Sequence, residues 1–442
     1  MYKKRLSVFL GLHLVILAGC GGNAGESGGL PRSSAKGDSE PVHLVVFQHG
    51  ANISDEEFRI LIAEPVKKKY PHISLELIHA NQEKTPENLI SSGNIPDLVF
   101  TNAAGVRLFK ELKTAEDLSG LAEKNQFDLN RFEPNVIETI KSIGNEDQLF
   151  AVPFSINFTA LFYNIDLFDK FGVPYPKDGM TWDEATDLAK QLTRIDNGQQ
   201  YYGLHPGGVE LKAEQLSLPY YDPVSRKALL TSDGWAKVFQ AHKAVTDIPG
   251  NQPGNAIKAF QQDQTLAMSA AKGARIGELE DLYQQGNPLK WDIVSFPTFR
   301  EAPRIDAEAA THMLMMTSAS KHKDAAFKVL EVVTEEANQA AMNKRGRLTS
   351  LKDPKIKENF GSNLQSLKGK NVNAIFYNTP AVNRNHDRFS DLVKSQIGPA
   401  INKVVKGEAD INTALREAQE AANKLIEAEL NKQIPDTERG SR

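Results

Sequence analysis

The sequence is poor in several features that would fix a function at once. It has one cysteine in 442 residues, so it can form no internal disulfide and no cysteine-ligated zinc site. It also lacks an excess of basic residues, because 52 Lys and Arg stand against 56 Asp and Glu, for a net charge of −4. Without such an excess little can neutralise a phosphate backbone, and we expect no nucleic acid partner.

Motifs for metal, nucleotide and catalytic chemistry are missing as well. The ten histidines are scattered singly, with no H-E-x-x-H spacing that would put two ligands on one helix face. The segment 273–278 (GARIGE) lacks the spacing and the Lys-Ser/Thr pair of a phosphate-binding loop. We therefore expect no metal, no cofactor and no enzymatic activity. A glycosidase stays open as an alternative, because its two carboxylates need only converge across a cleft.

Length and composition indicate a soluble globular protein of two or three domains. With 40% hydrophobic and 24% charged residues, each of two lobes of roughly 200 residues could bury its own core. Beyond the first twenty residues, no stretch is long and apolar enough to cross a bilayer.

The amino-terminal residues look like an export signal followed by a lipid-attachment site. Basic residues at 3–5 precede the almost entirely apolar residues 6–18, which are too few to span a bilayer comfortably. The sequence Leu-Ala-Gly-Cys at 17–20 resembles the lipobox of bacterial lipoprotein precursors, in which Cys20 takes the lipid. We expect a lipoprotein signal peptide at 1–19, with the alternative of an incidental cysteine near an ordinary signal peptide.

Residues 20–40 consist mostly of Gly, Ser and charged residues and predict a flexible tether. Acyl chains contribute about 0.8 kcal/mol per buried CH₂, and two or more chains anchor a protein stably. We therefore expect a lipoprotein on the extracellular face of the cytoplasmic membrane, in contact with the membrane through its lipid anchor.

From Val42 onward, strands and helices alternate. Residues 44–47 form a continuous apolar run that is typical of a strand buried on both faces, and residues 97–100 form another. Between them, apolar residues recur at helical spacing over 60–66 and alternate over 73–77. This order predicts a parallel sheet covered by helices.

A second series begins near residue 150. Strands are predicted at 161–163, 266–268 and 291–294, with a helix from Trp182 to Leu192. Thr181 and Glu184 have the spacing of a capping box at the start of this helix. One apolar face of a long carboxyl-terminal helix is predicted to contain Leu415, Ala418, Ala422, Leu425, Ile426 and Leu430.

Several short motifs in this order resemble the extracellular solute-binding proteins of family 1, which include maltose-binding protein. The resemblance covers residues 42 to about 430. Each motif is weak alone, but together and behind a lipobox they form a strong set. The motifs are IPDLV at 95–99, AVPF at 151–154, LFYN at 161–164 with Phe168, MTWDE at 180–184, Ala267-Met268, VSFPT at 294–298 and KDAA at 323–326.

The resemblance implies a two-lobed α/β fold, the periplasmic-binding-protein-like fold of type II, with the ligand in the cleft between the lobes. It implies a first lobe of 41–152 plus 303–350 and a second of 153–302 plus 351–432. The chain would cross between the lobes near 150–157, 296–310 and 345–352.

Polar residues at the carboxyl ends of predicted strands are the candidates for ligand contact, because open α/β sheets bind ligands there. Hydroxyls of a sugar need hydrogen-bonding side chains, and its apolar faces suit aromatic rings. Helix capping is an equally good interpretation for Asn52, and a hinge hydrogen bond is the alternative for Asn157. A solvent-exposed loop explains His205 equally well. The candidates of this kind are Gln48, His49, Asn52 and Asn102. Asn157 and Phe158 are candidates because they lie at the first crossover, where the resemblance implies a polar ligand contact. His205 is a candidate that follows the sequence Tyr-Tyr-Gly at 201–203.

Two further candidates lie in the second series. Arg275 carries a planar, permanently charged group that suits a carboxylate or phosphate and would indicate an acidic ligand. The more ordinary interpretation is a surface arginine paired with Glu278 or Glu280. Trp291, at the start of a strand, is as readily a core residue as a stacking platform, whereas Trp182 and Trp235 are expected in the core.

Together these features predict the lipid-anchored, ligand-capturing component of an ABC importer, with a sugar or oligosaccharide as its expected cargo. The expected partners are a small carbohydrate ligand, with an acidic one as an option, and an ABC permease in the membrane. We expect a monomer. The alternatives are a surface-anchored polysaccharide hydrolase or lyase, and a ligand sensor for a signalling receptor.

Overall fold

The structure is a computed structural model that describes residues 40–144, 148–381 and 387–432. The predicted signal peptide at 1–19, Cys20 and the predicted tether up to residue 39 lie outside the described residues. The statements below concern the unit from Glu40 onward.

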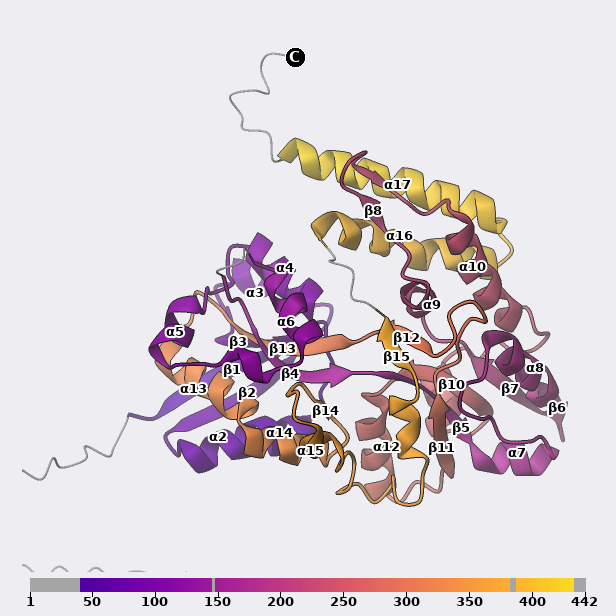
Figure 1. Ribbon diagram of the computed structural model, residues 1–442, viewed down its shortest axis with the longest axis horizontal. Coiled ribbons are helices and arrows are strands. Elements are labelled where there is room, and N and C mark those ends of the chain that lie inside the picture. The colour runs from indigo at the N-terminus through magenta and orange to yellow at the C-terminus, as the bar shows by residue number, and fades with distance from the viewer. Residues whose placement is uncertain (1–39, 145–147, 382–386, 433–442) are drawn as a thin grey trace, which may run out of the picture. The chain divides into compact units, whose positions relative to one another are not determined.

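A six-stranded sheet, the first sheet, is built from two distant parts of the chain (Figure 1). The predicted parallel pairing of strands is confirmed for β1 with β2 and for β1 with β3. It is wrong for the other half of the sheet, where β13 runs antiparallel to both β3 and β4. In order across the sheet, the strands are β14 (Leu348–Thr349), β4 (Val152–Asn157), β13 (Ala310–Met316), β3 (Leu98–Thr101), β1 (Val42–Gln48) and β2 (Ile73–His79).

Helices from the same two parts of the chain cover this sheet. The first of them starts with a capping box formed by Ser54 and Glu57 and continues through a π-helical turn. The elements are α1 (Asp55–Phe58), η1 (Arg59–Ala63), α2 (Glu64–Lys69), α3 (Pro86–Ser91), α4 (Ala103–Glu111), α5 (Ser119–Lys124), η2 (Leu129–Arg131), α6 (Pro134–Lys141), α13 (Lys323–Thr334), α14 (Glu336–Asn343) and α15 (Pro354–Lys357).

A five-stranded sheet, the second sheet, has mixed strand directions. Strand β10 is parallel to β7 but antiparallel to β5, and β5 is antiparallel to β11. In order, the strands are β11 (Trp291–Ser295), β5 (Thr159–Asn164), β10 (Leu266–Lys272), β7 (Gln199–His205) and β6 (Arg194–Asp196).

The predicted helix from Trp182 to Leu192 and its capping box by Thr181 and Glu184 are confirmed as α8. The helices of this part are α7 (Ile165–Phe171), α8 (Trp182–Leu192), α9 (Val209–Gln215), α10 (Asp233–Thr246), α11 (Ala256–Gln261), α12 (Arg275–Gln284), η3 (Val372–Phe376), α16 (Arg388–Val405) and α17 (Ile411–Lys432).

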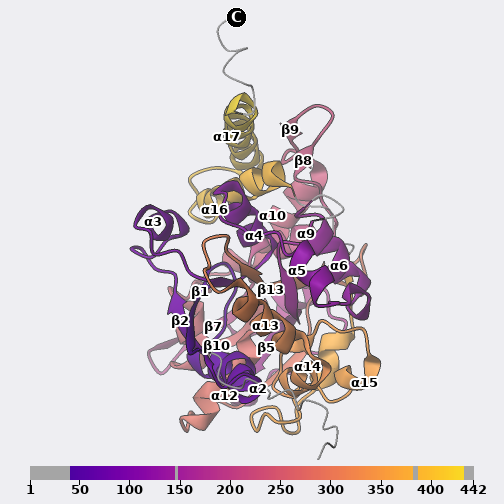
Figure 2. The ribbon, with the colours of Figure 1, turned by 90° about the vertical axis from the view of Figure 1, so that its left-hand side faces the viewer.

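Two short ladders complete the strands of the described chain. Strand β12 (Ile305–Glu308) pairs with β15 (Thr379–Ala381), and β8 (Tyr221–Asp222) pairs with β9 (Lys227–Ala228). Figure 2 shows the β8–β9 hairpin beside α17, where Asn423 accepts a hydrogen bond from the backbone N–H of Ala228 at 2.8 Å.

The chain passes between the sheets within very few residues. Strand β4 of the first sheet ends at Asn157, and β5 of the second sheet begins at Thr159. Strand β12 leads into β13 over the same region. Asp306 on β12 accepts hydrogen bonds from the Thr159 hydroxyl and, at 2.8 Å, from its neighbour's backbone N–H. Burial raises the pKa of Asp306 to about 7.

Two large apolar clusters hold the fold together, since burial of apolar side chains is its main source of stability. Trp182 and Trp235 lie in the core as expected, with 3% and 0% of their surface exposed. Leu425 does not share the buried face of α17 and is 38% exposed. At 100° per residue, the stripe through Ala418, Ala422 and Ile426 leaves Leu425 at its border.

Candidate functional site

One cavity, the central cavity, gathers turns that follow strands of both sheets. It has a volume of about 240 Å³ and is lined by residues that follow β1, β3 and β10, by the end of β4 and by the beginning of β13. Such turns are where open α/β sheets bind ligands. Its polar lining residues are Asn52, Asn102, Asn157, Lys272, Arg275, Glu278 and His312.

On the first-sheet wall, the Asn102 amide is bound to backbone groups. Asn102 caps α4 by accepting a hydrogen bond from the Gly105 N–H at 3.0 Å, and it donates another to the Gly50 carbonyl. Gly50 has a φ of 78°, a conformation that glycine adopts at little cost and that turns the chain sharply after β1. The shape of this wall is therefore fixed by its own hydrogen bonds.

A buried arginine braces the same wall from behind. Arg347 has a 5% exposed side chain and donates to Glu57 from Nε at 2.8 Å and from Nη2 at 2.6 Å. Its Nη2 also donates to the Asn52 carbonyl at 2.8 Å, and its Nη1 donates to Nδ1 of His312 at 3.1 Å. One guanidinium therefore connects the turn after β1, the start of α1 and β13.

The second-sheet wall is charged. Strand β10 ends at Lys272, whose side chain is exposed and has no hydrogen-bond or ion-pair partner among the described residues. Arg275 begins α12 with only 12% of its side chain exposed. Its Nε lies 3.1 Å from Glu278, whereas its Nη1 is buried without a hydrogen-bond partner in the described chain. Burial lowers the pKa of Arg275, and Glu278 opposes that shift.

Arg275 pairs with Glu278, as an ordinary surface arginine would. Its side chain is, however, more buried than that of a surface arginine. A guanidinium that is nearly enclosed and retains an unused N–H is costly unless an acceptor reaches it. Arg275 is therefore a candidate for contact with an anionic group.

Asn157 joins the two walls. Its Oδ1 accepts a hydrogen bond from the Ala274 N–H, in the turn between β10 and α12, at 3.1 Å. Its amide nitrogen lies 3.3 Å from Nε2 of His312. Burial, with the nearby Arg347 and Lys272, holds the pKa of His312 well below its ordinary value, so its ring is neutral.

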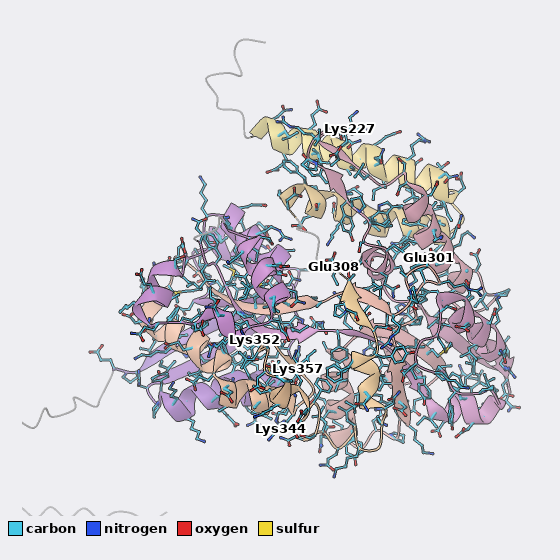
Figure 3. The ribbon with its side chains drawn as sticks, in the orientation of Figure 1. Lys227, Glu301, Glu308, Lys344, Lys352 and Lys357 are labelled. Carbon is cyan, nitrogen blue, oxygen red and sulfur yellow. The ribbon has the colours of Figure 1, made fainter. Side chains whose placement is uncertain are left out.

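A second cavity of about 180 Å³, the side cavity, shares Asn102, Lys272 and Ala310 with the central one. Cavities of about 300–1,000 Å³ are usual for small-molecule ligands, a range that the two adjoining spaces reach together. Charged residues of both signs line the side cavity. They are Arg107, Lys272, Lys394, Glu214, Glu308 and Asp391, of which Glu308 is seen at the end of β12 in Figure 3.

An ion pair spans the side cavity from α4, beside the first sheet, to α16. Arg107 donates to Asp391 from Nε at 2.8 Å and from Nη2 at 3.1 Å, with 11% and 19% of the two side chains exposed. Arg388 and Glu111 form another pair between the same helices at 3.2 Å. Burial lowers the pKa of Lys394, and Glu214, Glu308 and Asp391 oppose that shift.

Of the residues that the sequence singled out, the structure brings Asn52, Asn102, Asn157 and Arg275 to the central cavity. Gln48 and His49 stand near it but face other groups. Gln48 donates to the Ala51 carbonyl at 3.0 Å, and the His49 ring stacks on Phe47 at 5.9 Å.

The two aromatic candidates lie elsewhere. Phe158 packs against Phe360, with ring centroids 5.6 Å apart, and lines a separate cavity of about 490 Å³. Trp291 is 3% exposed and packs against Phe162, with centroids 5.8 Å apart, beside a further cavity of about 510 Å³. Neither cavity contains a residue of the turns that follow β1 and β3.

His205 lies behind the second-sheet wall rather than in the cavity. Burial, together with Lys212 and Arg275, lowers the pKa of His205 to about 4. Lys212 is fully buried, donates to the Pro206 carbonyl at 2.6 Å and lies 3.6 Å above the Trp182 ring. Burial lowers the pKa of Lys212 to about 7. This group braces the turn after β7.

Three residues of the site escaped the sequence reasoning. Lys272 satisfies the rule that singled out the other candidates, because it ends a strand, and could have been found by it. His312 lies in a mostly apolar strand, and Arg347 lies next to a short strand with no local pattern.

In the described part of the chain, no three His, Cys, Asp or Glu side chains come together as metal ligands would. None of its helices has the length and apolar character needed to cross a membrane.

Residues 52–340 match the bacterial extracellular solute-binding proteins. The chain belongs to this family. Such proteins bind solutes and are not enzymes. A Brucella abortus protein whose name describes it as a binding protein is 24% identical to this solute-binding protein over 258 residues. That match spans 56% of the chain and 60% of the relative's length.

Solved structures confirm the predicted two-lobed α/β fold of this solute-binding protein. ABC substrate-binding protein Lmo0181 from Listeria monocytogenes, in complex with cycloalternan, is 19% identical with a TM-score of 0.71, over 88% of this chain and 100% of that one. A solute-binding protein from Thermotoga lettingae bound to α-D-tagatose gives the same values. The sugar-binding protein MalE from Xanthomonas citri is 17% identical with a TM-score of 0.64, over 89% and 100% of the two chains.

Proposed function

We propose that this protein captures a sugar or oligosaccharide outside the cell and delivers it to an ABC permease. The observation that carries the proposal is the central cavity, in which turns after β1 and β3 face the turn after β10. A ligand there would contact both sheets at once. Proteins of similar structure have been solved with cycloalternan, tagatose and mannobiose bound, which supports a carbohydrate ligand.

The mechanism that we propose is closure of two lobes on the ligand. The lobes that we propose follow the predicted bounds, 41–152 plus 303–350 and 153–302 plus 351–432, with one change. Strand β4 belongs to the first sheet, so we place the first crossing near Phe158. A ligand that touches both walls favours the closed state by its differential affinity for that state. The pair Arg107–Asp391 would act in the same direction, since it also connects the two sides.

Within the site, we propose that Asn52, Asn157 and Arg275 contact the ligand and that Asn102 shapes the wall. Gln48, His49, Phe158, His205 and Trp291 would support the site from their positions outside the central cavity.

Titration calorimetry against neutral and acidic mono- and oligosaccharides, with solution scattering on each complex, tests this function. A micromolar dissociation constant corresponds to a binding free energy of about 8 kcal/mol. Binding of such a ligand should make the protein more compact. No binding by any saccharide, with scattering that never changes, would contradict the proposal. A matched variant, Asn157→Ala, should weaken binding, whereas Asn255→Ala, on a cap outside the cavity, should not.

The rival functions predict different results. A hydrolase or lyase would release new reducing ends from a glycan, which a reducing-sugar assay detects. A sensor for a signalling receptor would bind the ligand, but deletion of its gene would leave uptake of the labelled sugar unchanged.

We also propose that Cys20 carries the lipid that holds the protein at the extracellular face of the membrane. A Cys20→Ala variant should appear in the medium, and the parent should incorporate labelled palmitate. Equal membrane retention of both proteins would contradict the anchor.

A further inference from the structure

We infer that the ligand is a saccharide that bears a carboxylate, such as a uronate-containing sugar, and that this carboxylate binds Arg275 and Lys272. This inference rests on the proposed capture function and adds the chemical class of the ligand.

The first support is the state of the Arg275 guanidinium. Its side chain is 12% exposed, and its ion pair within the described chain uses Nε, which lies 3.1 Å from Glu278. Nη1 is enclosed without an acceptor in the described chain. A carboxylate has two oxygens and accepts well from the parallel N–H groups of a guanidinium. Such a ligand would satisfy the donor that the protein itself leaves unused.

The second support is the count of charges around the central cavity. Lys272 and Arg275 contribute two positive charges, Glu278 contributes one negative charge, and His312 is neutral. The remaining excess of one positive charge matches a carboxylate. A phosphate monoester, which carries close to two negative charges at neutral pH, would exceed it.

The third support is the contrast with the side cavity, where Glu214, Glu308 and Asp391 are balanced by Arg107, Lys272 and Lys394. This cavity has no excess positive charge to offer an anionic group, whereas its carboxylates suit the hydroxyls of a sugar. The ligand would therefore lie with its acidic end at Arg275 and its hydroxyl-rich end near Glu308.

The test uses an array of oligosaccharides that pairs neutral glycans with uronate-containing ones of equal length. Calorimetry then measures the dissociation constants of the ligands that the array selects. Digalacturonate and mannobiose are included in every series. The parent should bind uronate-containing members only. Arg275→Gln should weaken that binding about 30-fold or more, as expected when one partner of a largely buried charge pair is removed. Lys272→Gln should weaken it about two- to fivefold, because that side chain is exposed.

Further variants separate charge recognition from folding. Arg275→Lys keeps the charge but loses the planar fork and should recover only part of the affinity. Arg300→Gln removes an arginine with a 73% exposed side chain, outside the residues lining either cavity, and should leave binding unchanged. Circular dichroism and thermal unfolding show whether each variant is folded; if Arg275→Gln is not, Arg275→Lys and Lys272→Gln carry the test.

The outcomes distinguish this inference from the proposed function. Tight binding of neutral saccharides that Arg275→Gln leaves unchanged would overturn the carboxylate inference and leave sugar capture intact. Calorimetry with a sugar phosphate is added to the series, and tighter binding of that phosphate than of the uronates would overturn the carboxylate assignment alone. Failure of every saccharide to bind would overturn both.

Discussion

The two walls of the central cavity differ in chemistry although both are formed by turns after strands. On the first-sheet side, the Asn102 amide and the Asn52 carbonyl are tied to Gly50 and Arg347. On the second-sheet side, Lys272 and Arg275 retain unused hydrogen-bond donors. The first wall is therefore a fixed surface, and the second provides positive charge that an anionic ligand group would neutralise. Variants that loosen the first wall should cost stability, whereas those that change the second should change specificity.

The largest expected effect is a loss of stability when the arginine behind the first wall is replaced. Arg347→Met should lower the free energy of unfolding by about 3–5 kcal/mol, because it leaves Glu57, which is also largely buried, without its partner. Urea denaturation measures the change. Arg416→Met, in an exposed pair with Glu420 on α17, is the control and should change it by less than about 0.5 kcal/mol. Equal effects of the two variants would show that Arg347 does not brace the wall.

The next effect concerns the buried lysine behind the second wall. The pKa of Lys212 lies near 7 in the folded protein and near its ordinary 10.5 in the unfolded chain. Between these values the unfolded chain binds more protons, so the stability contribution of Lys212 rises with pH and is lost as pH falls from 10.5 to 7. The slope due to this group is about 1.4 kcal/mol per pH unit.

Lys212→Met should remove that slope. Urea denaturation at pH 8 and pH 9 compares the variant with its parent. From the lower to the higher pH, the unfolding free energy of the parent should rise by about 1 kcal/mol more than that of the variant. Lys190→Met, on an exposed pair in α8, controls for loss of a lysine and should leave the slope unchanged. An unchanged slope in Lys212→Met would mean that Lys212 stays charged over this range.

The smallest effect compares two caps. Asn102 and Asn255 both accept an N–H bond at the start of a helix, but Asn102 also donates to the Gly50 carbonyl. Loss of a cap costs about 1 kcal/mol, and loss of the second bond about 1 kcal/mol more. Asn102→Ala should therefore destabilise the protein by about 1 kcal/mol more than Asn255→Ala in thermal or urea unfolding. Equal losses would show that the bond to Gly50 contributes nothing.

Local patterns were sufficient to predict much of the fold. The capping box of Thr181 and Glu184 and the alternation of strands and helices lie within short stretches of sequence, where spacing is informative. The antiparallel strands β13 and β4 were out of reach, because their pairing joins residues more than 150 positions apart, such as Ala310 and Asn157. Strand direction across such a separation is set by the packed whole rather than by local spacing.

The site was predictable to a similar extent. The rule about strand ends indicated Asn52 and Asn102, the family resemblance indicated Asn157, and the chemistry of a guanidinium indicated Arg275. The structure places all four at one cavity. The rule about strand ends did not separate side chains that face a cavity from those held by neighbours, as Gln48 and His49 are. It also gave no sign of Arg347, whose importance comes from three contacts distant in sequence.

A final consequence comes from the passage between the sheets. Only Phe158 separates β4 from β5, and its ring is wedged against Phe360. This connection is very short and lies beside the passage from β12 into β13, so few backbone torsions can rotate. The angle between the two proposed lobes would therefore change along nearly one direction. Energy transfer between two dyes, one attached to each lobe, would then report the fraction of protein that has bound ligand. The protein could in this way serve as a fluorescent sensor of its ligand.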